Sequence, residues 1–230
     1  MVGVVRRRPP RQSADSGGGD GRRLFFVRAD VRNQQDVKRA VSQAIRQFGK
    51  IDILVNNAAA RGPTAPVTNL TLKEWQEVLD TNLTGPFLFS RECLKYMVKQ
   101  NEGQVINISS VVARWAYPLR APYAASKAAL ISLTLTLAQE AGCANVRVNA
   151  VCPGPVEGKA LHGVLNERAR VLGISRDEME RRFMGPAALG RKITADDISR
   201  MVLFLCSDAA RNVTGQVIDV SAGYGLYPGI

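Results

Sequence analysis

The chain has 230 residues, of which 46% are hydrophobic and 22% charged, and its formal net charge is +11. This balance suits one α/β domain or two small ones and excludes a disordered chain, a collagen and a disulfide scaffold. No apolar run approaches the roughly 18 residues of a membrane helix, and no apolar stretch follows Arg6–Arg8 as in a secretory signal. Four widely spaced cysteines and a single histidine argue against a metal site and favour a reduced, cytoplasmic compartment.

The positive charge is concentrated at the start of the chain. Residues 1–50 carry twelve Lys and Arg against four Asp, whereas the remaining residues are nearly balanced. A basic start is typical of nucleic-acid binding, of an acidic partner, of a phosphate site or of a solvated tail. No aromatic side chains are interleaved with the arginines at positions 6–23, which argues against a nucleic-acid partner.

Strands and helices are predicted to alternate after a Gly/Pro-rich segment at residues 9–23. In chain order we expect a strand at 24–27, a helix at 36–48, a strand at 51–55, a helix from the capping box Thr71–Glu74 to about 100, a strand at 104–108, a helix at 123–141, a strand at 146–151, a helical segment at 161–184 broken at Gly163 and Gly173, a helix at 195–206 after Thr194 and a strand at 217–220. Near-continuous apolar strands that alternate with helices are typical of a parallel sheet covered on both faces. The sequence therefore predicts a doubly wound α/β fold.

Tyr123 and Lys127 open the Ala-rich helix and lie four residues apart, so they share one face of it. A cation near a phenol favours the phenolate, which would lower the tyrosine pKa and make the group useful for proton transfer near neutral pH. Taken alone, the pair is better explained by a half-buried tyrosine beside a surface lysine.

Other polar residues cluster where the predicted strands end. Ser110 follows one strand, Asn56 and Asn57 another, and Pro153–Gly154 a third. Asn82 lies inside a predicted helix, where asparagine is a poor helix former. Because ligands of such sheets bind beyond the carboxyl ends of the strands, these residues predict a ligand site at that edge.

In this combination the sequence resembles the short-chain dehydrogenase/reductase family. The resemblance runs from about residue 22 to residue 223 and is carried in order by Ala29-Asp30-Val31, Asn56-Asn57-Ala58-Ala59, Asn82 in an Asn-x-x-Gly segment, Ile108-Ser109-Ser110, Tyr123-x-x-x-Lys127 and Pro153-Gly154. It implies a Rossmann-like domain at residues 24–230 that transfers a hydride between NAD or NADP and an alcohol or ketone. A 3-oxoacyl group, a diol and a secondary alcohol are the substrate classes that it leaves open.

The resemblance also implies a role for each matching residue. Tyr123 would be the acid/base, Ser110 the carbonyl anchor, Lys127 the group that lowers the phenol pKa and holds the nicotinamide ribose, and Asn82 the support of a proton-relay water. Asp30 and Val31 would contact the adenine, Asn57 and Ala58 would flank the adenosine, and Pro153 and Gly154 would border the nicotinamide. Family members form homodimers or homotetramers, which we expect here through the helices at 72–100 and 121–141.

The sequence departs from the family pattern at its start. Family members carry a Thr-Gly-x-x-x-Gly-x-Gly turn that approaches the cofactor pyrophosphate, and this sequence has none. We interpret residues 1–23 either as the remnant of the family's second strand and helix, with the first βαβ unit absent, or as an unrelated tail. The departure leaves a second functional interpretation open, a non-catalytic or impaired protein of the same fold.

The cofactor preference depends on the same segment. If Val2–Val5 is the family's second strand, Arg6, Arg7 and Arg8 follow its carboxyl end, where the adenosine ribose lies. Guanidinium groups bind phosphate through charge-assisted hydrogen bonds, so this interpretation favours NADP over NAD.

Overall fold

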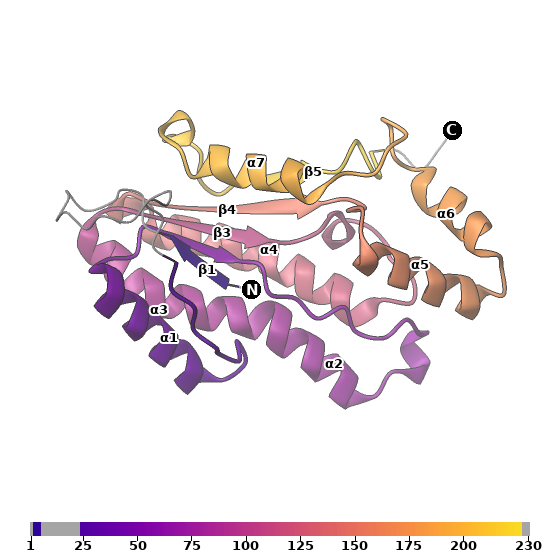
Figure 1. The fold of residues 1–230 in the computed structure, drawn as a ribbon, viewed down its shortest axis with the longest axis horizontal. Coiled ribbons are helices and arrows are strands. Elements are labelled where there is room, and N and C mark those ends of the chain that lie inside the picture. Colours follow the sequence, from indigo (N-terminus) through magenta and orange to yellow (C-terminus); the bar gives the residue numbers. More distant parts are fainter. Residues whose placement is uncertain (1, 6–23, 227–230) are drawn as a thin grey trace, which may run out of the picture.

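The computed structural model describes residues 2–5 and 24–226 and arranges them as one sheet with helices on its two faces (Figure 1). The sheet has the order β1-β2-β3-β4-β5. Its strands are β1 (Val2–Val5), β2 (Ile53–Asn56), β3 (Gly103–Ile108), β4 (Val146–Pro153) and β5 (Val217–Val220). Strands β2 to β5 pair in parallel, which confirms the predicted α/β fold.

The helices match most of the predicted segments. They are α1 (Gln34–Phe48), α2 (Leu72–Leu79), α3 (Gly85–Gln100), α4 (Ala121–Ala141), α5 (Lys159–Leu172), α6 (Arg176–Met184) and α7 (Ala195–Leu205). The predicted capping box at Thr71 is present, and a second one at Thr194 begins α7. Each box satisfies backbone N–H groups that the first helical turn leaves without partners.

A π-helical turn, Asp80–Thr84, joins α2 to α3 where the sequence predicted one continuous helix. Such turns widen a helix locally and occur often at functional sites. The turn contains Asn82, whose side chain is fully buried. The irregular geometry therefore falls on the asparagine that the sequence singled out.

The core has one large layer and one smaller layer. Helices α1, α3 and α4 cover one face of the sheet, where Val37, Phe89, Met97, Val105 and Val148 are buried together (Figure 1). Helix α7 lies on the opposite face and packs Leu205 against Ile106 and Val151. No helix in the described part of the chain combines the length and apolarity needed to cross a bilayer.

The strand predicted at residues 24–27 is not formed. The segment is extended but unpaired, with Leu24 77% and Phe26 82% exposed, and Phe25 packs its ring against Phe48 at a centroid distance of 6.3 Å. The edge of β2 that another strand could join is occupied by β1. An apolar run of β-forming residues becomes a strand only where a neighbouring edge accepts its hydrogen bonds.

Strand β1 runs antiparallel to β2, with Val2 opposite Asn56 and Val5 opposite Ile53. Its carboxyl end therefore lies at the amino end of β2, at the opposite edge of the sheet from the expected ligand site. Val2–Val5 thus does not form a parallel strand in this sheet, and its interpretation as the remnant of the family's second strand stays a prediction. The argument for NADP depended on that geometry, and Arg6, Arg7 and Arg8 lie outside the described residues.

The helical segment at residues 161–184 is broken once rather than twice. Gly173 ends α5 in a left-handed conformation, as predicted, with φ of 65°. Gly163 lies inside α5, where a Cβ atom would come within 2.9 Å of the Arg61 guanidinium. The glycine is explained by this close approach rather than by a helix end.

Candidate active site

Parallel pairing brings the expected site residues to one edge of the sheet. Asn56 pairs in register with Asn107, and Ile108 pairs with Val151, so strands β2, β3 and β4 end side by side. The amino-terminal turns of α4 lie against this edge, where Ser109 Oγ donates a hydrogen bond of 2.8 Å to the Lys127 carbonyl. Ser109 thus supports the fold.

Ser110, Tyr123 and Lys127 come together at this edge. Lys127 Nζ lies 5.8 Å from the Tyr123 ring centroid and donates a hydrogen bond of 2.7 Å to the Ile108 carbonyl. Ser110 is buried and hydrogen-bonds to the Tyr123 side chain. A hydroxyl, a phenol and an ammonium therefore converge on one small region, which is the arrangement that carbonyl binding and proton transfer require.

Burial dominates the electrostatics of these groups. It raises the pKa of Tyr123, and the Ser110 hydrogen bond and the Arg120 charge offset the rise only in part. It lowers the pKa of Lys127 to about 8. A site of low dielectric disfavours the charged forms of both groups, and the effect of the lysine on the phenol pKa stays a prediction.

Asn82 joins two segments near Tyr123. Its Oδ1 accepts a hydrogen bond of 2.7 Å from the Ala60 amide, and its Nδ2 donates bonds of 3.0 Å to the Ala60 carbonyl and to Ser126 Oγ. Ser126 Oγ in turn donates to the Tyr123 carbonyl at 2.8 Å. The side chain thereby ties the loop after β2 to the first turn of α4, and its role toward a relay water stays a prediction.

The two asparagines that follow β2 have different environments. Asn56 is buried, and its Nδ2 donates to Asn107 Oδ1 at 2.8 Å and to Ser90 Oγ at 3.2 Å. Asn57 is exposed, and Ala58 is partly buried beside it. Asn56 therefore supports the sheet, whereas Asn57 and Ala58 are accessible to a ligand.

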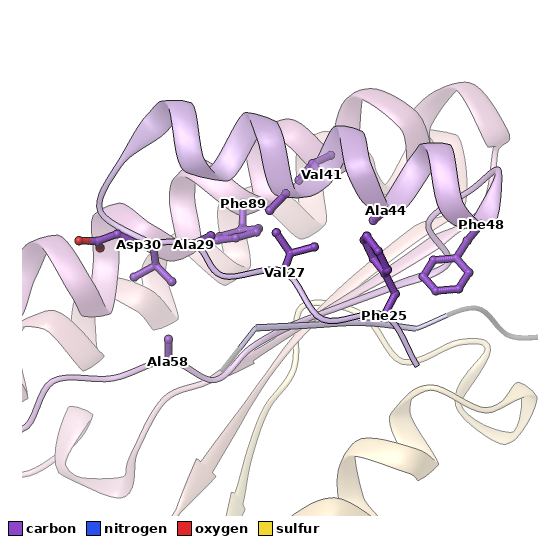
Figure 2. Close-up of a pocket in the computed structure, with 11 residues that line it drawn as sticks. Phe25, Val27, Ala29, Asp30, Val41, Ala44, Phe48, Ala58 and Phe89 are labelled. Atoms are coloured by element: carbon purple, nitrogen blue, oxygen red, sulfur yellow. The ribbon is translucent and has the colours of Figure 1, made fainter. Parts of the chain in front are cut away.

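A cavity of about 500 Å³ lies between the extended segment at 24–31 and helix α1 (Figure 2). Asp30, Val31 and Ala58, which the sequence placed at the adenosine, all line it. Arg32 pairs with Asp30 at 2.7 Å and holds the pKa of that carboxyl at about 2. The three residues are thus brought together at the edge of the sheet.

Gly154 closes the other end of the site. Its amide donates a hydrogen bond of 2.9 Å to the Val220 carbonyl, and a Cβ atom at this position would lie 2.8 Å from the Ser221 Cα. Only glycine allows β4 and the segment after β5 to approach this closely. Pro153 and Gly154 therefore form a backbone wall beside the catalytic group.

Sequence reasoning missed Arg120, which forms the N-cap of α4 three residues before Tyr123. Its side chain is 2% exposed, and its Cζ lies 5.7 Å from the Tyr123 ring centroid. Arginine is almost never fully buried unless paired, so its environment was not readable from the sequence. His162, in contrast, is exposed and contacts Glu157 at 3.0 Å, as expected of a surface residue.

The residues described fit a nicotinamide dinucleotide at two of its parts. The catalytic group and the Gly154 wall fit the nicotinamide end, and the cavity at Asp30 and Ala58 fits the adenosine end. The described residues supply no glycine-rich turn between them.

Comparison with known proteins agrees with this arrangement. The family model described as enoyl-(acyl carrier protein) reductase matches residues 6–225. The 3-oxoacyl-[acyl-carrier-protein] reductase FabG of Thermotoga maritima is 37% identical over 196 residues, which are 84% of this chain and 74% of that protein.

Two solved structures are similar over the same part of the chain. An NAD+-bound xylitol dehydrogenase superposes with a TM-score of 0.82 at 31% identity and covers 85% of this chain and 77% of its own. An actinorhodin polyketide ketoreductase with NADPH superposes with a TM-score of 0.81 at 31% identity, covering 86% and 77%. The chain therefore belongs to the short-chain dehydrogenase/reductase family of NAD(P)-dependent oxidoreductases.

Proposed function

We propose that the protein interconverts a ketone and an alcohol with NAD or NADP at the edge formed by β2, β3 and β4. The observation that carries the proposal is the convergence of Ser110, Tyr123 and Lys127. The names of the relatives support both a 3-oxoacyl substrate and a diol or secondary alcohol. These relatives use either dinucleotide, which supports NAD and NADP alike.

In this proposal the nicotinamide supplies or accepts the hydride, and the protein positions the substrate and moves the proton. Ser110 anchors the carbonyl oxygen, and Tyr123 donates the phenolic proton to it in the reducing direction. Lys127 holds its charge at the Ile108 end of β3, beside the phenol, where it stabilises the phenolate left after transfer. Asn82 keeps the first turn of α4 in register with the loop at Ala60.

The remaining roles follow the placement of the residues. Asp30, Val31, Asn57 and Ala58 would hold the adenosine part, and Pro153 and Gly154 would border the nicotinamide. Proline and glycine suit that position because they present a flat backbone surface without long side chains.

We also propose a homo-oligomer in a reduced, cytoplasmic compartment. Phe87 of α3 is 43% exposed and Leu135 of α4 is 47% exposed, which supports a partner on these helices. All four cysteines are free thiols, which supports the compartment. Light scattering at micromolar concentration tests the assembly, and a monomer would contradict it.

The proposal is tested by following the absorbance of reduced nicotinamide with a panel of ketones. Tyr123→Phe is expected to lower kcat/KM by roughly 10²- to 10⁴-fold, the range for loss of an acid/base group. Tyr96→Phe is the matched control, because it removes a phenolic hydroxyl from helix α3, outside the proposed site. Circular dichroism should show both variants folded. Retention of more than about a tenth of the activity in Tyr123→Phe would refute the assigned role.

A further inference from the structure

An arginine cluster lies near Tyr123, and the catalytic roles proposed above do not use it. It consists of Arg61, Arg120 and Arg168, which come from the loop after β2, the N-cap of α4 and helix α5. Arg120 is 2% exposed and Arg168 is 9% exposed. Arg120 thus lies against the Tyr123 ring, Arg168 lies against the Tyr117 ring, and the charge of Arg61 acts on Arg120.

The cluster is only partly neutralised. Glu167 Oε2 lies 3.8 Å from Arg120 Nη1, and its side chain is 45% exposed. Among the described residues, neither Arg61 nor Arg168 forms a salt bridge with a carboxylate. The positive charge of Arg61 disfavours the charged form of Arg120, so the arginines repel one another in the absence of a further anion.

The buried guanidinium groups also have unused donors. Arg120 Nη1 donates to Thr64 Oγ1 at 3.0 Å, and Arg168 Nη1 donates to the Pro118 carbonyl at 2.9 Å. The Nε atoms of both arginines are buried without a hydrogen-bond partner among the described residues. A buried donor without an acceptor costs about 1–3 kcal/mol, and more when it is charged. A purely structural role does not explain why two such donors lie together.

Aromatic side chains form the wall between the cluster and the helices after β4. Arg168 Cζ lies 4.9 Å from the Tyr117 ring centroid, and the Tyr117 ring lies 6.4 Å from that of Phe183. Tyr117 and Tyr123 both pack against the small apolar cluster of Val111, Val112 and Cys152. Charged donors next to apolar rings suit a small organic anion better than a fully hydrated ion.

We infer that the substrate of this enzyme carries a carboxylate that Arg120 binds while its carbonyl group lies at Ser110 and Tyr123. Arg168 and Arg61 add positive charge around the same group. The inference rests on the proposed function and narrows its substrate class to oxo acids and the corresponding hydroxy acids. A guanidinium matches the planar geometry of a carboxylate. Because Arg120 lies close to Tyr123, one small molecule can place its carboxylate at Arg120 and its carbonyl group at Tyr123.

The test compares oxo acids with their methyl esters, which keep the carbonyl and lose the charge. The positional isomers of oxopentanoate and their methyl esters are assayed with the wild type, Arg120→Met, Arg120→Lys and Arg200→Met. Arg200 lies on α7, where it is largely exposed and pairs with Asp196, so its variant is the control for loss of one guanidinium.

We expect the wild type to prefer at least one acid over its ester. Arg120→Met should lower kcat/KM for that acid by on the order of 100-fold more than for its ester, because both substrates lose the Arg120 charge beside Tyr123 but only the acid loses a charged hydrogen bond. Arg120→Lys should retain part of the preference, since lysine keeps the charge without the paired donors. Arg200→Met should behave as the wild type.

Equal rates for acids and esters in the wild type would overturn the inference, and this comparison needs no variant. A parallel loss of both substrates in Arg120→Met would also overturn it, because it indicates a structural role. If neither substrate is reduced, the proposed function fails, and calorimetry of acid binding decides the inference separately. Binding that disappears in Arg120→Met supports the carboxylate site, and no binding to the wild type refutes it.

Discussion

The two ends of the ligand edge differ in how firmly the protein holds them. At the catalytic end, Asn82 is fully buried and Lys127 is 2% exposed, and both side chains hydrogen-bond to backbone carbonyls of neighbouring segments. At the adenosine end, the segment at 24–31 is extended and unpaired, and Phe26 is 82% exposed. The difference indicates that hydrogen bonds within the protein fix the side chains at the catalytic end. The adenosine end has fewer such contacts to hold it.

Lys127 should give the largest effect at the catalytic end. Lys127→Met is expected to reduce turnover by on the order of 100-fold or more, because the positive charge beside Tyr123 is lost. The same change should raise stability at neutral pH relative to the wild type, since burial of the charge lowers the native pKa of the lysine to about 8.

The sign of the pH dependence follows from that shift. Between about pH 8 and the unfolded pKa near 10.5, the unfolded state binds more protons, so the wild type gains stability as pH rises. Below about pH 8 the buried lysine is charged, and the full free-energy cost of burying that charge is present. The stability advantage of Lys127→Met should therefore shrink by up to about 3 kcal/mol between pH 7 and pH 10.5 in urea melts. A pH-independent difference would contradict the buried, charged lysine.

Asn82 should give the next largest effect. Asn82→Ala removes three hydrogen bonds and leaves the Ala60 amide and carbonyl without their side-chain partner, which is expected to cost about 2–4 kcal/mol of unfolding free energy. Asn69→Ala, at an exposed position in the short 3-10 helix Val67–Asn69 that precedes α2, should change stability by about 0.5 kcal/mol or less. Equal effects of the two substitutions in urea denaturation would show that the catalytic end is not held by Asn82.

The adenosine end should tolerate substitution best. Phe26→Ser removes a large exposed side chain and is expected to change the unfolding free energy by about 0.5 kcal/mol or less. A loss of more than about 2 kcal/mol in the same melts would indicate that this ring is buried in solution, in an assembly or otherwise.

Sequence reasoning reached the catalytic end because its signals are local. The four-residue spacing of Tyr123 and Lys127 places both on one face of α4, and strand order then brings Ser110 to them. The capping box was likewise readable, since two residues three positions apart, Thr71 and Glu74, determine it.

The remaining features depend on residues distant in sequence. Residues 24–27 have the composition of a strand, but they form one only if a sheet edge is free to pair with them. In this structure β1 occupies the edge of β2. Glycine at position 163 predicts a break in the helix, but the helix continues through it. The glycine is needed there because the Arg61 guanidinium approaches the backbone closely. The direction of the Tyr123 pKa depends on burial, which no spacing reveals, and the same holds for Arg120.

The central claim is that the catalytic end transfers a hydride to a carbonyl carbon while Tyr123 delivers the proton. The most direct measurement uses NADH and NADPH deuterated at the transferred position and analyses the alcohol by mass spectrometry. The account predicts one deuterium on the carbinol carbon with the wild type and with Tyr96→Phe, and a yield at least tenfold lower with Tyr123→Phe. Alcohol without deuterium, or equal deuterium transfer by Tyr123→Phe, would contradict it.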